Sequence, residues 1–455
     1  MDNICALATA MGGAIALIRV SGDDAIKITD SIFTCDISEA QGRTLHYGRI
    51  LDTEGNTIDD VIVSVYRAPH SYTGENSTEI SCHASTYIVK SILETLIKSG
   101  CRQAQPGEYT MRAYMNGKMD LSQAEAVADL IASTNKATHQ LALGQLRGNF
   151  SSELSSLRDK LLKMTSLLEL EMDFSDQDVE FANRQELLTL AETIDSRIKS
   201  LMDSFNTGNA IKKGIPVAII GKTNVGKSTL LNRIIGDDKA IVSDVHGTTR
   251  DVIEDTINIH GVTFRFIDTA GIRDTQDTVE KIGIERTYKK IDEASIIIWL
   301  IDELPSDTEI NDIIQKTTDK KLIVVENKID KDSNTNNVHN ALEEKLKGSN
   351  TKILRISAKK DIGVTDLLDV IYTSANIPEI RENDVIITNA RHYDSLHHAS
   401  QSIGYVIEGL RNNVSGDLLS EDLRMCINYL GDIVGGTISS QETLNNIFSH
   451  FCIGK

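Results

Sequence analysis

Residues 221–228 read Gly-Lys-Thr-Asn-Val-Gly-Lys-Ser and directly follow a short apolar run at 217–220. The run predicts a buried strand. The two glycines allow the loop to turn its N–H groups, with the N-terminus of the next helix, toward phosphate oxygens. Lys227 would place its charge near the β and γ phosphates, and Ser228 would give a hydroxyl to Mg²⁺. The stretch therefore predicts an α/β P-loop domain.

Four further signatures of guanine-nucleotide binding follow in the expected order: GTTRD at 247–251, DTAG at 268–271, NKID at 327–330 and SAK at 357–359. Thr249 can offer Mg²⁺ a second hydroxyl, Asp268 can hold a metal-bound water, and Asp330 can accept the two N–H donors of guanine. One such string occurs by chance, whereas five in order predict a GTPase. The predicted GTP-binding residues are Asn224, Val225, Gly226, Lys227, Ser228, Thr229, Ser243, Thr248, Thr249, Asp268, Thr269, Ala270, Gly271, Asn327, Lys328, Asp330, Ser357, Ala358 and Lys359.

The position after Asp-x-x-Gly, where many small GTPases carry a water-orienting glutamine, is Ile272. Because isoleucine cannot hydrogen-bond to water, the chain either hydrolyses GTP poorly or positions water with another group. Glu280 and Glu285 lie in the segment VEKIGIER at 279–286, and their carboxylates could reach back to the nucleotide. A solvated helix start with both charges facing water is an equal alternative.

Length and charge limit the function classes. The 455 residues allow two or three domains. A formal net charge of −19, from 47 basic and 66 acidic residues, argues against extensive direct RNA binding, although a local basic pocket or a basic partner is compatible with it. The six cysteines form no C-x-x-C pair, a pattern that suits a reducing cytosol. No apolar run reaches about 18 residues and no secretory signal opens the chain, so we expect a soluble cytoplasmic protein.

The pattern of apolar residues divides the chain into four segments. Residues 1–118 mix short β-rich runs, such as 14–20 and 61–66, with turn residues, which predicts an α+β domain. Apolar residues at helical spacing occupy 119–213 and return in 376–455, on either side of the GTPase signatures at 214–375. The two helical stripes are Leu154, Leu157, Leu161, Met164 and Leu168, and Leu396, Ala399, Ile403, Val406 and Leu410. Since each stripe needs burial, we expect the two segments to pack together as one all-α domain that contains the GTPase domain as an insertion.

Two local features concern the start of a helix and the C-terminal end of the chain. Ser122 and Glu125 have the spacing of a capping box, which predicts the start of the first helix there. The chain ends FCIGK at 451–455, where Cys452 has the position of a prenylated cysteine. Its glycine and terminal lysine do not fit that signal, so we expect no lipid anchor. From the residues alone, this tail indicates a frayed end.

The whole arrangement resembles the tRNA-modification GTPase family called MnmE or TrmE. The resemblance covers essentially the entire chain. It is carried by LIRVSG at 17–22, SYTGENSTEI at 71–80, PGEYTMRAYMNGKMDLSQAEAVADLI at 106–131, GTTRD, DTAGIR, VEKIGIER and the tail. It implies an N-terminal domain similar to folate-dependent one-carbon enzymes, which mediates homodimerisation and binds 5-formyl- or 5,10-methylene-tetrahydrofolate. The implied folate-binding residues are Arg19, Glu79, Lys118 and Lys455, with Cys452 near the reaction.

The resemblance also implies the ions and the catalytic group. K⁺ would be held by Asn224, Ser243, Val245 and Thr248, and Mg²⁺ by Ser228 and Thr249. K⁺ would supply the charge that an arginine finger gives elsewhere. Glu280 would be the catalytic residue, acting through a bridging water.

The implied function is modification of tRNA. With an FAD-dependent partner protein, in an expected heterotetramer, a homodimer of the chain would install an aminomethyl-type (carboxymethylaminomethyl-like) group on C5 of the wobble uridine of certain tRNAs. The reaction would use a tetrahydrofolate one-carbon unit, and GTP hydrolysis would open and close the paired GTPase domains. Two rival classes remain. A ribosome-assembly GTPase switch predicts a basic C-terminal RNA module, and a dynamin-like mechanical GTPase predicts no folate pocket.

Overall fold

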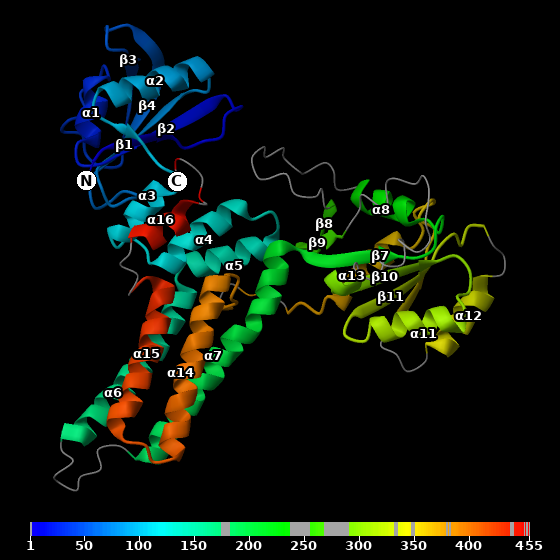
Figure 1. The fold of residues 1–455 in the computed structure, drawn as a ribbon. Coiled ribbons are helices and arrows are strands. Elements are labelled where there is room, and N and C mark those ends of the chain that lie inside the picture. The colour runs from blue at the N-terminus through cyan, green and yellow to red at the C-terminus, as the bar shows by residue number, and fades with distance from the viewer. Residues whose placement is uncertain are drawn as a thin grey trace. The chain divides into compact units, whose positions relative to one another are not determined.

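The computed structural model (Figure 1) describes residues 2–173, 183–236, 255–267, 291–331, 335–346, 351–378, 381, 384–436, 441–449, 451 and 454. The chain forms two compact units. The first unit comprises 1–132, 142–200 and 391–455, and the second comprises 133–141 and 201–390. The predicted fold class is confirmed: an α+β domain and a helical domain form the first unit, and an α/β domain lies in the second.

The N-terminal α+β domain contains a six-stranded sheet in the order β3-β4-β5-β2-β1-β6. Its strands and helices are β1 (Ile4–Leu7), β2 (Ile15–Ser21), α1 (Ala25–Ser31), β3 (Thr44–Leu51), β4 (Thr57–Tyr66), β5 (Ser77–His83), α2 (Thr86–Lys98), β6 (Arg102–Gln103) and α3 (Glu108–Met115). Only β1 and β6 pair in parallel; the other neighbours are antiparallel. The runs at 14–20 and 61–66 are thus confirmed as strands, within β2 and β4.

The faces of this sheet differ because side chains alternate along each strand. On β2, Ala16, Ile18 and Val20 are buried in the core that α1 and α2 complete. Arg19 therefore lies on the opposite face, where it pairs in register with Glu79 of β5. The alternation of β2 and β5 places these two polar residues side by side.

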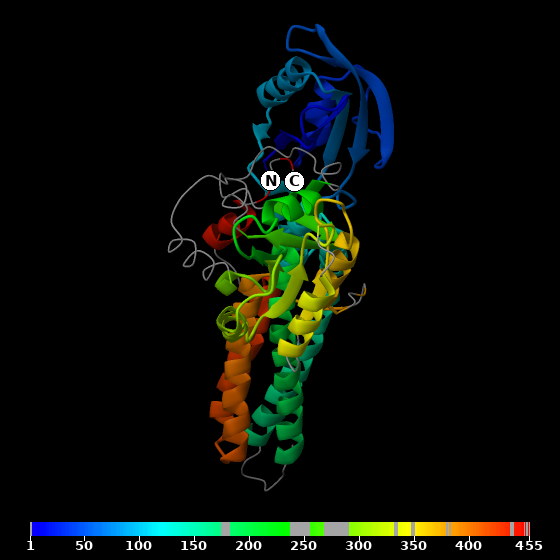
Figure 2. The same ribbon diagram turned by 90° about the vertical axis from the view of Figure 1, so that its right-hand side faces the viewer.

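The helical part of the first unit is built from both ends of the sequence. Its helices are α4 (Leu121–Ala132), α5 (Lys136–Leu146), α6 (Asn149–Asp173), α7 (Arg184–Lys213), α14 (Ala390–Arg411), α15 (Gly416–Val434) and α16 (Gln441–Ser449), of which α5, α7 and α14 also extend into the second unit. All ten residues of the two predicted stripes are buried, none more than 4% exposed. α6, α7, α14 and α15 run alongside one another (Figures 1 and 2), and α6 packs against α15. The two sequence-separated helical segments therefore do pack together.

The predicted capping box was wrong by two residues. Ser122 is buried inside α4, which begins at Leu121. The reciprocal bonds instead join Asp120 and Gln123: the Gln123 N–H donates to Asp120 Oδ1, and the Asp120 N–H donates to Gln123 Oε1, both at 2.9 Å. Aspartate caps a helix as well as serine does. Because Asp120 and Gln123 form the cap, the side chain of Glu125 can contact residues of another helix.

The second unit contains a sheet in the order β12-β11-β10-β7-β9-β8. Its elements are β7 (Ile215–Ile220), α8 (Lys227–Gly236), β8 (Asp255–Ile259), β9 (Val262–Phe266), β10 (Ile296–Ile301), α11 (Asp307–Lys316), β11 (Lys321–Glu326), α12 (Thr335–Lys345), β12 (Lys352–Arg355) and α13 (Val364–Ser374). All neighbours are parallel except the β8–β9 hairpin. The apolar run at 217–220, predicted to be a buried strand, is confirmed as part of β7.

Residues 133–141, which run from the end of α4 into the first half of α5, belong to this second unit. Asn135 Nδ2 donates to Thr263 Oγ1 at 2.7 Å, and the Ala137 N–H donates to the Gly261 carbonyl at 3.1 Å. Both contacts attach the segment to the β8–β9 hairpin. None of the helices in the described parts of the chain is both long and apolar enough to cross a membrane.

A buried charged cluster holds the start of α14 against α4. Arg391 donates to both carboxylate oxygens of Glu125 at 3.0 and 2.9 Å, and His392 Nε2 lies 2.7 Å from Glu125 Oε2. Burial alone would raise the pKa of Glu125. The hydrogen bond and charge of His392, and then those of Arg391, instead lower this pKa to about 2. The carboxylate is thus ionised throughout the physiological range and joins two helices that lie far apart in sequence.

We predict that Glu125→Gln lowers the free energy of unfolding of the helical domain by about 3 kcal/mol at neutral pH, because the amide leaves the partly buried Arg391 guanidinium without its counter-charge. The folded pKa of Glu125, about 2, lies below its ordinary value of 4.5. This stabilisation is therefore complete above pH 4.5 and is lost as pH falls toward 2. Urea unfolding followed by far-ultraviolet circular dichroism at several pH values measures the difference between the two proteins.

Glu192→Gln is the matched control. Glu192 pairs with Arg411 at 2.6 Å, but the two side chains are 46% and 57% exposed. Its loss should change stability by less than about 0.5 kcal/mol. A Glu125→Gln effect no larger than this control, or one that persists unchanged toward pH 2, would contradict the assignment.

Candidate functional site

The predicted phosphate-binding loop lies at the carboxyl end of β7, whose neighbours in the sheet are β10 on one side and β9 on the other. In open α/β sheets, ligands bind at such a point, where the strand order reverses. Gly221 (φ +144°) and Gly226 (φ +109°) shape the loop. A Cβ on Gly221 would lie 2.2 Å from the Leu300 carbonyl oxygen, and one on Gly226 would lie 2.3 Å from Asn327 Nδ2. Only glycine fits at either position.

The loop leads directly into α8. Lys227, Ser228 and Thr229 form its first turn, where helix N–H groups favour an anion. In this structure the Lys227 ammonium donates to the carbonyls of Gly221 and Lys222 at 2.6 and 2.7 Å. The ammonium therefore lies against the loop that is predicted to surround the phosphates.

Asn327 joins this loop to the two predicted base-binding segments. Its side-chain Nδ2 donates to the Val225 carbonyl at 2.8 Å, and its Oδ1 accepts the Ala358 N–H at 3.0 Å. Asn327 follows β11 and Ala358 lies just beyond β12, so one buried amide fixes three loops at the edge of the sheet. The sequence predicted a nucleotide-binding residue here, and the structure gives the same residue a bracing role.

The remaining base-binding residues lie close to one another. Ser357 Oγ donates to Asp330 Oδ1 at 2.6 Å, and this bond holds the pKa of the Asp330 carboxyl below its usual range. An ionised Asp330 is the state that accepts two N–H donors. The Lys328 ammonium donates to the Asn224 carbonyl at 2.7 Å and to Asp302 at 2.6 Å. Lys359 is exposed beside this group.

Several predicted residues lie outside the described part of the chain. They are Ser243, Val245, Thr248, Thr249, Asp268, Thr269, Ala270, Gly271, Glu280, Cys452 and Lys455.

A second group of predicted residues meets on the N-terminal sheet. Arg19 Nε and Nη2 lie 2.9 and 2.7 Å from Glu79 Oε1. Oε2 of Glu79 makes no hydrogen bond within the described residues. The Arg19 guanidinium lies over the rings of Tyr72 and Tyr109, 5.3 and 5.6 Å from their centres. The Lys118 ammonium makes a different contact, donating to the Pro69 carbonyl at 2.9 Å.

Sequence reasoning missed both tyrosines, although each lies in a stretch that carries the family resemblance: Tyr72 in SYTGENSTEI and Tyr109 in PGEYTM. The Tyr109 hydroxyl donates to the Arg19 carbonyl at 2.8 Å, and the Tyr72 hydroxyl lies 2.9 Å from Thr110 Oγ1. Arg19 is therefore held by its charge partner and by two rings.

The C-terminal tail reaches the same face, so the frayed end suggested by the residues alone is wrong for its described positions. Gly454 (φ +92°) is buried, and its carbonyl accepts a hydrogen bond from Arg19 Nη1 at 3.4 Å. A Cβ on Gly454 would lie 2.2 Å from the Leu7 carbonyl oxygen. Phe451 packs on Phe448, with ring centres 5.1 Å apart. Gly454 thus lies against β1 and beside Arg19.

Comparisons with known proteins identify the family of the chain. The family model described as the GTP-binding protein TrmE N-terminus matches residues 3–118, and the one described as the MnmE helical domain matches residues 121–452. Proteins named tRNA modification GTPase MnmE from Bacteroides fragilis and Bacteroides thetaiotaomicron are each 54% identical over 100% of this chain and 99% of their own. The protein of that name from Flavobacterium johnsoniae is 49% identical with the same coverage. The chain therefore belongs to the MnmE (TrmE) family.

Proposed function

We propose that this chain is a K⁺-activated GTPase that acts in tRNA modification. With an FAD-dependent partner protein it forms an aminomethyl-type, carboxymethylaminomethyl-like group at C5 of the wobble uridine of certain tRNAs, from a tetrahydrofolate one-carbon unit. One observation carries the proposal: the docked tail brings Gly454 to the Arg19–Glu79 pair in a chain that also holds a guanine-nucleotide site. Neither a ribosome-assembly switch nor a mechanical GTPase requires that second site.

The nucleotide part of the proposal uses the second unit. The first turn of α8 and Lys227 bind the phosphates, and the ionised Asp330 selects guanine because adenine lacks the matching pair of N–H donors. Ser228 and Thr249 are the proposed Mg²⁺ ligands. Mg²⁺ would neutralise charge on the phosphate oxygens.

The K⁺ site is proposed around Asn224. This residue has φ +61°, and its carbonyl is already held by Lys328. Its side chain makes no hydrogen bond within the described residues, which supports a role as a K⁺ ligand together with Ser243, Val245 and Thr248. We assign water positioning to Glu280, since Ile272 cannot do it.

The folate site is proposed on the open face of the N-terminal sheet. Oε2 of Glu79 is an acceptor for a ring N–H of the ligand, and Lys118 and Lys455 are cations suited to its glutamate carboxylates. Lys455 directly follows the docked Gly454. Cys452 belongs to the same tail, and we propose that it lies near the reaction.

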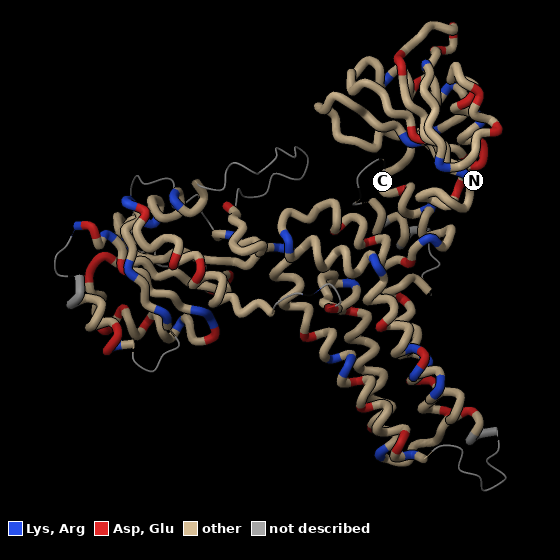
Figure 3. The backbone as a smooth tube through the Cα atoms, turned by 180° about the vertical axis from the view of Figure 1, so that it is seen from behind, with Lys and Arg blue, Asp and Glu red and all other residues tan. Residues whose placement is uncertain are grey.

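Assembly is proposed from the same face. Leu45 and Tyr47 of β3 are 71% and 70% exposed, and Ile62, which pairs with Tyr47, is 44% exposed. This apolar group supports a homodimer through the N-terminal domain. Figure 3 shows acidic positions interspersed with basic ones along the backbone of both units, and the net charge is −19. We therefore assign most of the grip on tRNA to the partner protein, in a cytoplasmic heterotetramer.

We also propose the domain division made from the sequence. It assigns 1–118 to the folate-binding and dimerisation domain, 119–213 and 376–455 to the helical domain, and 214–375 to the GTPase domain. Matches of family models to 3–118 and 121–452 support it.

Nucleoside analysis of tRNA tests the function directly. In a strain that lacks the gene for this chain, wobble uridines should lose the C5 aminomethyl-type group, and the intact chain should restore it. Lys227→Ala should fail to restore it, because the loop loses its phosphate-binding charge. A normal set of wobble nucleosides in the deletion strain would sink the proposal and favour the two rival classes.

A comparison of salts tests the ion. GTP hydrolysis should be at least about tenfold faster in K⁺ than in Na⁺ at equal ionic strength, since a charge of arginine-finger type is worth more than this. Asn224→Ala should remove the difference by removing a ligand, while GTP affinity stays near normal. Equal rates in both salts for the unmodified protein would show that it has no such site.

A further inference from the structure

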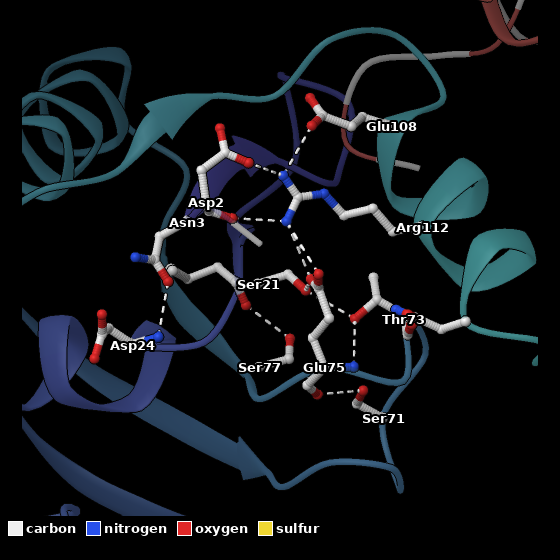
Figure 4. Close-up of polar contacts among 12 residues, drawn as sticks. Asp2, Asn3, Ser21, Asp24, Ser71, Thr73, Glu75, Ser77, Glu108 and Arg112 are labelled. Atoms are coloured by element: carbon white, nitrogen blue, oxygen red, sulfur yellow. Dashed lines mark hydrogen bonds and ion pairs between the residues drawn. The ribbon is translucent and has the colours of Figure 1, made fainter. Parts of the chain in front are cut away.

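A charged network in the N-terminal domain is centred on a buried arginine (Figure 4). Its centre is Arg112 of α3, which is only 3% exposed. The guanidinium lies 3.2 Å from Glu75, 3.0 Å from Glu108 and 2.6 Å from Asp2. Neither the nucleotide site nor the Arg19–Glu79 pair uses these residues. Such a group is costly to bury unless every charge has a partner, so its geometry is tightly fixed.

The network holds the loop between β4 and β5. Ser21 Oγ donates to Glu75 Oε2 and also bonds Thr73 Oγ1, both at 2.7 Å, and Ser71 Oγ donates to the Glu75 carbonyl (Figure 4). From the other side, Asn116 Nδ2 donates to the Thr73 carbonyl at 2.8 Å. Residues 71–75 are therefore tied both to β2 and to the end of α3.

Tyr72 lies in the middle of this fixed loop. Its hydroxyl bonds Thr110, and its ring faces the Arg19 guanidinium. The residue nevertheless remains 36% exposed, whereas Tyr109, the other ring beside Arg19, is fully buried. Of these two rings, only that of Tyr72 can contact a ligand at the Arg19–Glu79 pair.

We infer that Tyr72 is the surface on which the flat bicyclic heterocycle of a folate-type ligand stacks, and that the Glu75–Arg112 pair is the positioning element for this ring. The inference rests on the proposed folate site. A tyrosine ring suits a planar heteroaromatic partner, and Oε2 of Glu79 offers an acceptor for the edge of the same ring system. The site would then recognise the heterocycle itself, and not only the carboxylates at the other end of the ligand.

Two probes separate these parts of the ligand. 5-Formyltetrahydrofolate contains the heterocycle, and p-aminobenzoylglutamate lacks it but keeps the carboxylates. By calorimetric titration, Tyr72→Ala should weaken binding of 5-formyltetrahydrofolate about tenfold and leave binding of the fragment unchanged within about twofold. Tyr72→Phe, which keeps the ring and loses the bond to Thr110, should stay within about threefold of wild type for both probes.

Tyr87→Ala is the matched control. Tyr87 is 76% exposed and belongs to α2, on the opposite face of the sheet, so its loss should change neither affinity. The positioning element is tested by Glu75→Gln, which keeps the size of the side chain but removes its charge. We expect this variant, checked for folding by thermal unfolding, to weaken 5-formyltetrahydrofolate at least threefold and to spare the fragment.

The outcomes are distinguishable. If the wild-type protein binds neither probe, the proposed folate site itself is wrong, and this inference falls with it. If the wild-type protein binds both probes and Tyr72→Ala binds 5-formyltetrahydrofolate equally well, the site stands and stacking on Tyr72 is overturned. A folded Glu75→Gln variant with wild-type affinity would remove only the positioning role. Should Glu75→Gln fail to fold, Arg112→Lys, which keeps the charge, replaces it with the same expectation.

Discussion

The buried carboxylate of Glu125 determines where the chain goes after it leaves the second unit. Arg391 and His392 are the first residues of the last segment of the first unit, and both bind this carboxylate, which lies 266 and 267 positions earlier. The contact begins α14 against α4, and α15 can then pack on α6. Because the chain returns at this point, α16 can pack on α3, and Gly454 can reach β1 of the N-terminal sheet. The Gly454–Arg19 contact therefore depends on a cluster that contains no proposed ligand-binding residue.

Both candidate sites are built from groups fixed before any ligand arrives. Asn327 braces the phosphate loop against the segment that backs the base. Its side chain lies so close to residue 226 that only glycine fits there. Arg19 is fixed in a comparable way by Glu79 and two rings. Prior organisation of this kind reduces the ordering cost of binding. The guanine site and the proposed folate site also belong to different compact units, so a change in one site can leave the other intact.

Local patterns in the sequence predicted much of this fold. Spacing of apolar residues located the buried stripes of α6 and α14, and the glycines at 221 and 226 indicated the phosphate loop. Partners distant in the chain leave no such periodic signal, so neither the role of Glu125 nor the burial of Arg112 was predicted. The capping box was misplaced because Asp120 and Ser122 offer equivalent caps. The tail appeared frayed because the contact of Gly454 with Leu7 spans nearly the whole chain. Tyr72 was missed because a tyrosine in a turn-rich stretch has no distinctive spacing.

The central claim is that the C-terminal tail completes a ligand site on the N-terminal sheet, independently of GTP hydrolysis. The most direct test is the affinity of a Gly454→Val variant for 5-formyltetrahydrofolate, measured beside its rate of GTP hydrolysis. Valine is strained at φ +92°, and its Cβ would lie 2.2 Å from the Leu7 carbonyl oxygen, so the tail must leave its position. The account predicts folate binding at least about tenfold weaker, because one charge-assisted contact is lost. It also predicts a rate of GTP hydrolysis within about twofold of wild type. Unchanged folate affinity in this variant would contradict it.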